Sequence, residues 1–260
     1  MVAVGGRLVR SVALTVCLGV LLAPAGAATR APHQRLPSGF VHLREVDASI
    51  VQDIRYATPS NFTGSVVPGY AVGECILLEA AARALAQVQA DLRPRDLGLK
   101  VYDCYRPARA VKAFVDWVGR GAGAELGPYW PRTTRGGLVA AGYISSDSNH
   151  SRGVAVDLTL VRLDAAAPAG TGSTTAPCNG PAEVRRHDGS LDMGTSFDCF
   201  DVMSATGSRE ITAEQRRNRQ LLVSAMAGRG FRNYRREWWH FTYGGARGAT
   251  KPEDVPVQGR

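Results

Sequence analysis

The sequence predicts a single α+β domain in which helices pack on one mainly antiparallel sheet. Apolar residues recur at helical spacing in residues 75–92 and 111–118, and a third helix is expected from 212 to 228. Residues 99–105 and 154–160 are short, largely apolar runs, which are typical of strands buried in a sheet. The chain has no internal repeat and no alternating strands and helices with a phosphate-binding loop, which excludes a nucleotide-binding fold of that kind.

The first residues have the pattern of a secretory signal peptide, which we place at residues 1–27. Two arginines precede an apolar run from 11 to 23, and a series of small residues follows it. The apolar run is too short to span a bilayer comfortably, and no second run of membrane length follows. We therefore expect a secreted, extracytoplasmic protein formed by residues 28–260, without a membrane span.

The mature chain is basic, but its charge is spread along the sequence. The formal charge of the whole chain is +8, and removal of Arg7 and Arg10 lowers it to +6. The remaining arginines alternate with acidic residues, whereas nucleic-acid binding requires a clustered basic stripe. The sequence therefore predicts no nucleic-acid partner, and it carries no signal for an oligomeric state.

The cysteines of the mature chain are Cys75, Cys104, Cys178 and Cys199. An even number in an exported protein favours disulfides, and the absence of a Cys-x-x-Cys pair argues against a thiolate metal site. Four cysteines allow three pairings. Of these we expect Cys178–Cys199, which would tie down a low-complexity insertion at 165–181, and Cys75–Cys104, which would join the first helix to the next strand.

Two polar stretches predict a metal site. His150 lies seven residues before Asp157, which interrupts an otherwise apolar strand and would be costly to bury unless it is paired or bound to a metal. Glu237-Trp238-Trp239-His240 supplies a second imidazole and another carboxylate. Two imidazole nitrogens and one carboxylate oxygen form a ligand set for a catalytic zinc with its fourth position open to water. The other carboxylate, Glu237, is then free to act as a base on that water.

Each of these residues also has a simpler interpretation. A lone histidine such as His150 is more often an ordinary core or surface side chain, and residues 237–240 can form a strand with an aromatic face. In a strand, Glu237 and His240 point to opposite faces. They can serve one metal ion only if the strand bends or ends between them.

Taken in order, the motifs resemble those of the D-alanyl-D-alanine dipeptidase (VanX-like) zinc metallopeptidase family. Ser-x-His-x-x-Gly-x-Ala-x-Asp at 148–157 is followed by Glu-x-x-His at 237–240. Further similar stretches are residues 53–58, 61–64, 105–107 and 192–198. These landmarks span about residues 40–243, where we expect the core of the domain, with an irregular tail beyond.

The resemblance implies one zinc ion per chain at the centre of the sheet, with His150, Asp157 and His240 as its ligands. It implies Glu237 as the general base and Arg106 as the side chain that stabilises the developing oxyanion. The residues that match positions beside the substrate are Ser148, Asp198, Tyr56 and Tyr70. An aspartate such as Asp198 suits the free ammonium of a small D,D-dipeptide. The implied function is hydrolysis of D-Ala-D-Ala to two D-alanines. Together with the expected signal peptide, it predicts that this reaction takes place outside the cytoplasm, in cell-wall metabolism.

Two other functions fit the same motifs. A zinc carboxypeptidase that trims D-Ala from peptidoglycan stem peptides would share the metal ligands and differ at the ammonium anchor, Asp198. A zinc-binding module without catalysis would not need Glu237 and Arg106, and both are present. One departure from the family pattern is Cys104, which stands where a glycine usually precedes the Tyr-Arg-Pro motif.

Overall fold

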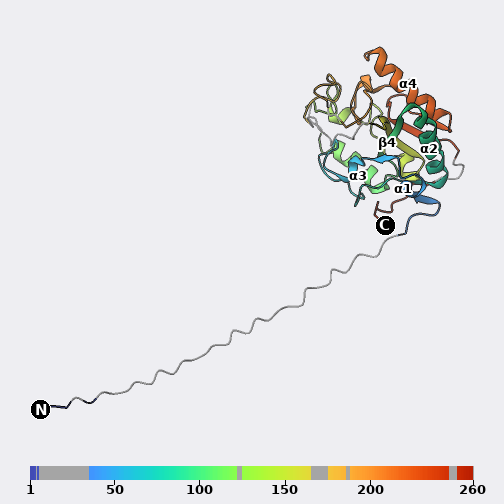
Figure 1. Ribbon diagram of the computed structural model, residues 1–260. Helices are drawn as coiled ribbons and strands as arrows, with labels where there is room; N and C mark the ends of the chain where they lie inside the picture. The colour runs from blue at the N-terminus through green and yellow to red at the C-terminus, as the bar shows by residue number, and fades with distance from the viewer. Residues whose placement is uncertain are drawn as a thin grey trace. The chain divides into compact units, whose positions relative to one another are not determined.

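A five-stranded sheet forms the centre of residues 33–260, the larger of the two units into which the chain divides (Figure 1). Its strands, in spatial order, are β2 (Val51–Gln52), β4 (Leu97–Asp103), β5 (Ala155–Arg162), β7 (His240–Tyr243) and β6 (Phe231–Asn233). Only the β2–β4 pair is parallel. A separate antiparallel pair joins β1 (Phe40–His42) to β3 (Ile76–Leu78). The predicted α+β class with a mainly antiparallel sheet is confirmed.

This computed structural model describes residues 1–3, 5, 35–121, 125–164, 175–185, 188–245 and 251–259. The expected signal peptide therefore lies outside the described residues, apart from 1–3 and 5, and so does the 165–174 part of the expected insertion. Within the described ranges, no helix combines the length and the apolar character needed to cross a membrane.

Four α-helices accompany the sheet in the described part of the chain: α1 (Leu43–Val46), α2 (Glu79–Leu92), α3 (Ala108–Gly119) and α4 (Ala213–Ala227). Short 3₁₀ turns occur at Arg55–Ala57, Arg93–Arg95, Arg135–Gly137, Asn149–Arg152 and Val202–Ser204. α4 begins with a capping box, in which Thr212 and Gln215 exchange hydrogen bonds and satisfy free backbone amides. α2 packs against β4, α4 packs against β5 and β6, and the two helices contact each other. They therefore cover the same face of the sheet (Figure 1).

The strand predicted at 154–160 is the central strand of the sheet. Every residue of β5 except Arg162 is buried, including Asp157 and Thr159. β4 on one side of it is buried along its whole length, and β7 lies on the other side. The polar residues of β5 are thus enclosed by neighbouring strands and need partners within the fold.

Two boundaries differ from the sequence prediction. The segment predicted as one helix from residue 75 starts as the strand β3, because residues 76–78 pair with β1, and the helix begins only at Glu79. The tail is not irregular throughout. Val257 is fully buried and forms a bridge with Tyr70, so the described residues 251–259 contribute to the core.

Candidate active site

Three polar side chains converge where β5 meets β7. Asp157 on β5 lies directly opposite His240, the first residue of β7, and His150 comes from the 3₁₀ turn just before β5. His240 Nδ1 lies 3.0 Å from Asp157 Oδ1 and 3.1 Å from His150 Nε2, and His150 Nε2 lies 3.3 Å from Asp157 Oδ1. Ligands of a tetrahedral metal ion with bonds of about 2.0–2.1 Å would lie about 3.3–3.4 Å apart. The triad therefore has the spacing to hold one metal ion.

The turn that carries His150 is fixed at both ends. The Ser148 hydroxyl oxygen accepts a hydrogen bond from the His150 backbone amide at 3.2 Å. Gly153 ends the turn with a φ of 68°, a conformation that favours glycine. A Cβ at Gly153 would lie 2.3 Å from Cε1 of Phe40. The glycine of the motif is thus required both by its backbone conformation and by the close packing of β1.

A backbone carbonyl fixes the tautomer of His150. His150 Nδ1 lies 2.6 Å from the carbonyl oxygen of Cys104. Because a carbonyl only accepts, Nδ1 carries the proton and donates it, and the lone pair of Nε2 faces Asp157 and His240. Cys104 is itself held by a disulfide to Cys75. The predicted pairs Cys75–Cys104 and Cys178–Cys199 are both confirmed.

The protonation states of the triad suit a cation. Burial lowers the pKa of His240 in spite of the carboxylate beside it, so its imidazole is neutral at neutral pH. Burial alone would raise the pKa of Asp157, but His150 and His240 outweigh it and lower the pKa. Asp157 is therefore ionised. A neutral imidazole and an ionised carboxylate are the forms that bind metal ions.

Strand β7 begins at His240, so Glu237 lies before the strand. The rule that successive side chains of a strand point to opposite faces therefore does not separate Glu237 from His240. The Glu237 backbone amide donates to the Tyr234 carbonyl at 2.9 Å, which places Glu237 in the turn between β6 and β7. From there Glu237 Oε2 reaches within 3.9 Å of His240 Nδ1. Burial raises the pKa of Glu237 well above its ordinary value, and the nearby charges of Asp157 and Asp198 raise it further.

Arg106 lies in the loop between β4 and α3 and is held from several sides. Its Nε donates to Asp103 Oδ2 at 2.9 Å, and its Nη2 lies 3.5 Å from Asp157 Oδ2. The guanidinium carbon lies 5.2 Å from the ring centre of Tyr56 and 5.1 Å from that of Phe114. Burial opposes the charge, but Asp103 chiefly raises the pKa of Arg106, so the guanidinium stays charged.

A cavity of about 240 Å³ opens beside the triad. The candidate site residues that line it are Tyr56, Arg106, Ser148, His150, Asp157, Asp198, Glu237 and His240. Its volume lies below the range of about 300–1,000 Å³ that is common for drug-sized ligands, so it suits a small molecule. Tyr70 does not line this cavity. Its hydroxyl donates to Asp103 Oδ1 at 2.5 Å, and the other oxygen of Asp103 accepts from Arg106.

Asp198 is a buried carboxylate that lines the cavity. The Tyr56 hydroxyl lies 2.9 Å and 3.1 Å from its two oxygens. Burial raises the pKa of Asp198 well above its ordinary value, and Asp157 raises it further. Its φ of 58° lies in the left-handed region, which aspartate tolerates better than most residues. The site therefore contains a carboxylate that a bound cation would stabilise.

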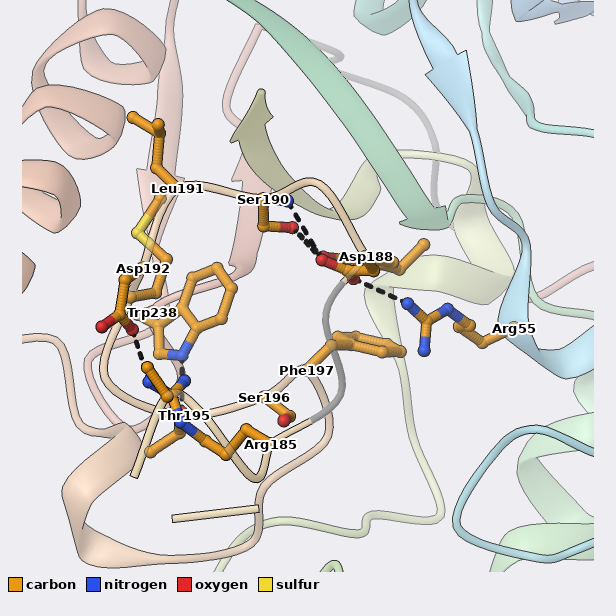
Figure 2. Close-up of a pocket in the computed structure, with 13 residues that line it drawn as sticks. Arg55, Arg185, Asp188, Ser190, Leu191, Asp192, Thr195, Ser196, Phe197 and Trp238 are labelled. Atoms are coloured by element: carbon orange, nitrogen blue, oxygen red, sulfur yellow. Dashed lines mark hydrogen bonds and ion pairs between the residues drawn. The ribbon is translucent and has the colours of Figure 1, made fainter. Parts of the chain in front are cut away.

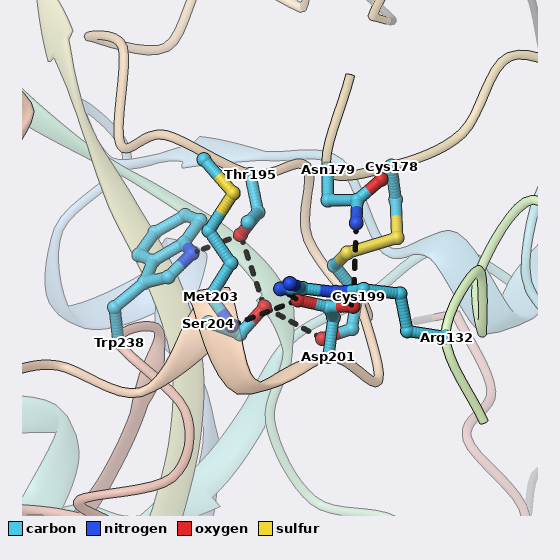
Figure 3. Close-up of a disulfide and its surroundings, with 9 residues drawn as sticks. All are labelled: Arg132, Cys178, Asn179, Thr195, Cys199, Asp201, Met203, Ser204 and Trp238. Carbon is cyan, nitrogen blue, oxygen red and sulfur yellow. Dashed lines mark hydrogen bonds and ion pairs between the residues drawn. A yellow bond between two sulfur atoms is a disulfide. The ribbon is translucent and has the colours of Figure 1, made fainter. Parts of the chain in front are cut away.

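The second disulfide fixes the residue next to Asp198. Figure 3 shows Cys178–Cys199 beside Asp201, which accepts a hydrogen bond from Arg132 Nε at 2.6 Å. The Cys199 carbonyl accepts from the Ser204 hydroxyl at 2.6 Å. The loop that carries Asp198 is thus anchored immediately after it.

A smaller cavity of about 70 Å³ is lined by residues 195–197, on the chain just before Asp198 (Figure 2). At its rim Asp188 accepts hydrogen bonds from Arg55 Nη2 and the Tyr102 hydroxyl, each at 2.7 Å. Lys100 Nζ lies 3.1 Å from the same carboxylate. Burial alone would raise the pKa of Asp188, but Lys100 and Arg55 lower it. These charges are paired with one another, as expected of a structural cluster.

Sequence reasoning did not single out Asp103. Asp103 lies opposite Asp157, and Asp157 lies opposite His240, so the three side chains form one row across β4, β5 and β7. The signal was an acidic residue at the end of an apolar strand, directly before the Tyr-Arg-Pro motif. It resembles the signal that identified Asp157.

Comparison with known proteins agrees with this geometry. The family whose sequence model matches residues 37–176 and 183–258 is described as D-ala-D-ala dipeptidase, within peptidase family M15. The D-alanyl-D-alanine dipeptidase of Enterococcus faecalis is 34% identical over 207 residues, covering 79% of this chain and 92% of that protein. The Streptomyces coelicolor protein of the same name is 33% identical over 204 residues, covering 78% and 90%. The Escherichia coli protein of that name is 29% identical over 202 residues, covering 78% and 83%.

Proposed function

Because the chain belongs to the D-Ala-D-Ala dipeptidase family of peptidases, we propose that it hydrolyses D-Ala-D-Ala to two D-alanines with the help of zinc. The observation that supports this most is the set of groups around one small cavity. The cavity is lined by a triad with metal-ligand spacing, a buried glutamate, a charged arginine and a second buried carboxylate, Asp198, whose pKa is raised by burial. Few other reactions need all four.

In this proposal His150, Asp157 and His240 hold one zinc ion. Zinc supplies a Lewis acid that activates water and polarises the scissile carbonyl. The hydrogen bond from His150 Nδ1 to the Cys104 carbonyl keeps the ligand nitrogen unprotonated and its ring in place. Asp157 adds a negative charge, which stabilises a cation in the buried site.

Glu237 transfers the proton. The reaction needs a group that takes a proton from the attacking water and gives it to the leaving nitrogen of the second D-alanine. A base is most effective when its pKa lies near the working pH. The burial of Glu237 raises its pKa above that of an ordinary glutamate, which supports this role.

Arg106 stabilises the negative charge that develops on the carbonyl oxygen. Its guanidinium lines the cavity and remains charged, and two aromatic rings restrict its motion. A donor that is already in position before the reaction stabilises the transition state without a further cost of reorganisation.

Asp198 binds the ammonium of the dipeptide, and Tyr56 orients Asp198 through its hydroxyl. Ser148 lines the same cavity and is proposed to lie beside the substrate. An ammonium paired with Asp198 would restore the ionised state that burial disfavours. This feature favours a dipeptidase over the alternative, a carboxypeptidase that acts on long stem peptides without a nearby ammonium.

We further propose that the protein acts outside the cytoplasm after removal of residues 1–27. The two disulfides support this, because disulfides persist in oxidising compartments. N-terminal sequencing of the secreted protein should read from Ala28. An N-terminus at Met1 in the exported protein would contradict it.

Metal removal tests the proposed chemistry. The purified protein is stripped with a chelator, and D-alanine release from D-Ala-D-Ala is measured as zinc is added back. Activity should return fully at one equivalent of zinc per chain. Full activity in the stripped protein, or no activity on the dipeptide at any zinc level, would contradict the proposal.

A further inference from the structure

We propose that Asp103 is a positioning residue that holds the Arg106 guanidinium away from the metal ligand Asp157 and aimed at the cavity. Tyr70 acts behind it by fixing the Asp103 carboxylate. This inference rests on the proposed function for its catalytic consequence, but its effect on metal binding can be measured without any substrate.

A bulge places Asp103 on the metal-binding face of the sheet. Along β4, Val101 pairs with Leu158 and Asp103 pairs with Asp157, so Tyr102 is an extra residue in the ladder. Such a bulge re-aims the side chains beyond it. Asp103 therefore shares a face with Asp157, and its side chain is completely buried.

Both oxygens of Asp103 are engaged. Oδ2 accepts from Arg106 Nε at 2.9 Å and lies 2.8 Å from Arg106 Nη2. Oδ1 accepts from the Tyr70 hydroxyl at 2.5 Å. His150 Nδ1 lies 3.4 Å from Oδ2, but its hydrogen bond goes to the nearer Cys104 carbonyl. Asp103 thus acts on Arg106 rather than on the orientation of His150.

Two buried carboxylates compete for one guanidinium. Arg106 Nη2 lies 2.8 Å from Asp103 Oδ2 and 3.5 Å from Asp157 Oδ2, so Asp103 holds it more closely. If the charge of Asp103 were lost, Asp157 would be the other carboxylate that forms an ion pair with Arg106 among the described residues. A guanidinium that moved onto Asp157 would compete with the metal for its lone pairs and repel the cation.

The same shift would remove Arg106 from the carbonyl of the substrate. Asp103 therefore serves two functions through one contact: it keeps Asp157 available to the metal, and it keeps a cationic donor in the cavity. Tyr70 is buried and does not line the cavity, and its hydroxyl donates to Asp103, so removal of that hydroxyl should act on catalysis through Asp103 and the neighbouring Arg106.

The test compares Asp103→Asn, Tyr70→Phe and the double variant Asp103→Asn/Arg106→Ala. Zinc affinity of each apoprotein is measured by competition with a chelator, and kcat and KM are measured on D-Ala-D-Ala. Asp103→Asn should weaken zinc binding about tenfold or more, as expected when a group that supports a ligand is changed. Its kcat should fall about a hundredfold, with KM changed much less. Tyr70→Phe should also weaken zinc binding and lower kcat, each by a smaller factor than Asp103→Asn.

The double variant decides between positioning and general destabilisation. If Asp103 protects Asp157 from Arg106, removal of Arg106 should restore zinc affinity to within about threefold of the wild type, although kcat stays low. A merely structural role for Asp103 would leave the affinity of the double variant as weak as that of Asp103→Asn, or weaker. That result would overturn the proposal, as would wild-type zinc affinity and kcat in Asp103→Asn.

Asp188→Asn is the matched control. Asp188 is also a buried carboxylate that accepts from an arginine and a tyrosine hydroxyl, but it lies at the other cavity. The Asp188→Asn variant should have a lower melting temperature, whereas the zinc affinity and kcat of its folded form should equal those of the wild type. If Asp103→Asn does not fold, Tyr70→Phe is used in its place. A Tyr70→Phe variant with the kcat and zinc affinity of the wild type would contradict the proposal. A wild type that binds zinc but ignores D-Ala-D-Ala would refute the proposed function while the affinities still decide this inference.

Discussion

His150 Nδ1 and the carbonyl oxygen of Cys104 lie 2.6 Å apart, so a metal-ligand candidate is oriented by a residue that a disulfide holds. The second disulfide fixes Cys199, directly after the proposed ammonium anchor Asp198. One disulfide thus lies beside the proposed metal site, and the other lies beside the proposed substrate anchor. The two can be removed separately.

Removal of either disulfide should destabilise the fold by a similar amount and affect different kinetic constants. The pairs close segments with sequence separations of 29 and 21 residues, and the chain-entropy model gives about 3.5 kcal/mol for loops of this size. Cys75→Ala/Cys104→Ala should weaken zinc binding. Cys178→Ala/Cys199→Ala should mainly raise KM for the dipeptide. Equal effects of both on zinc affinity would show that the disulfides act only through global stability.

Glu237→Gln separates proton transfer from metal binding. The amide keeps the shape of the side chain and cannot accept the proton, so kcat should fall by about 10²–10⁴. The protein should keep one zinc per chain, because Glu237 is not among the three side chains with ligand spacing. His240→Ala is the contrasting variant and should lose both zinc and activity. Turnover near the wild-type level in Glu237→Gln would remove Glu237 from the mechanism.

The tail residues 253–257 should be needed for activity although they do not line the cavity. The Glu253 amide donates to the Ser151 carbonyl at 2.8 Å, beside His150, and the Val257 amide donates to the Gly69 carbonyl at 2.7 Å, beside Tyr70. A chain that ends at residue 250 should lose thermal stability and kcat together. A chain that ends at residue 257 is the control and should behave like the wild type. Unchanged kcat in the shorter chain would show that the tail is dispensable.

The fold class could be predicted from the hydrophobic pattern, and the grouping of His150, Asp157 and His240 could be predicted from motifs that resemble those of a known family. Asp157 was recognisable as a carboxylate within an apolar strand, and its neighbours β4 and β7 do enclose it. The spacing of Glu237 and His240 did not decide whether both could serve one site, since in a strand their side chains would point to opposite faces. The turn that ends at His240 removes the conflict, and the position of that turn depends on the pairing of β6 with β7.

The remaining features depend on tertiary contacts that leave little trace in the sequence. The predicted start of α2 was wrong because the apolar residues 76–78 fit the pattern of a helix as well as that of a strand. Only their pairing with β1 makes them a strand. The sharing of Arg106 between Asp103 and Asp157 follows from a one-residue bulge at Tyr102, which no propensity predicts. The tail looked irregular because it is rich in charged residues and proline, yet Val257 is buried against Tyr70.

The central claim is that Asp198 selects a free dipeptide, and one substrate comparison tests it most directly. Asp198 is buried, and burial together with Asp157 raises its pKa more than Arg106 and the Tyr56 hydroxyl lower it. A free ammonium would pair with it, whereas N-acetyl-D-Ala-D-Ala would leave it unpaired, at a cost of about 1–3 kcal/mol or more. The wild type should therefore have a kcat/KM for D-Ala-D-Ala at least about tenfold higher than for the acetylated dipeptide. Asp198→Asn should narrow that ratio while keeping its zinc. Comparable cleavage of both substrates by the wild type would contradict the account and identify the protein as a carboxypeptidase.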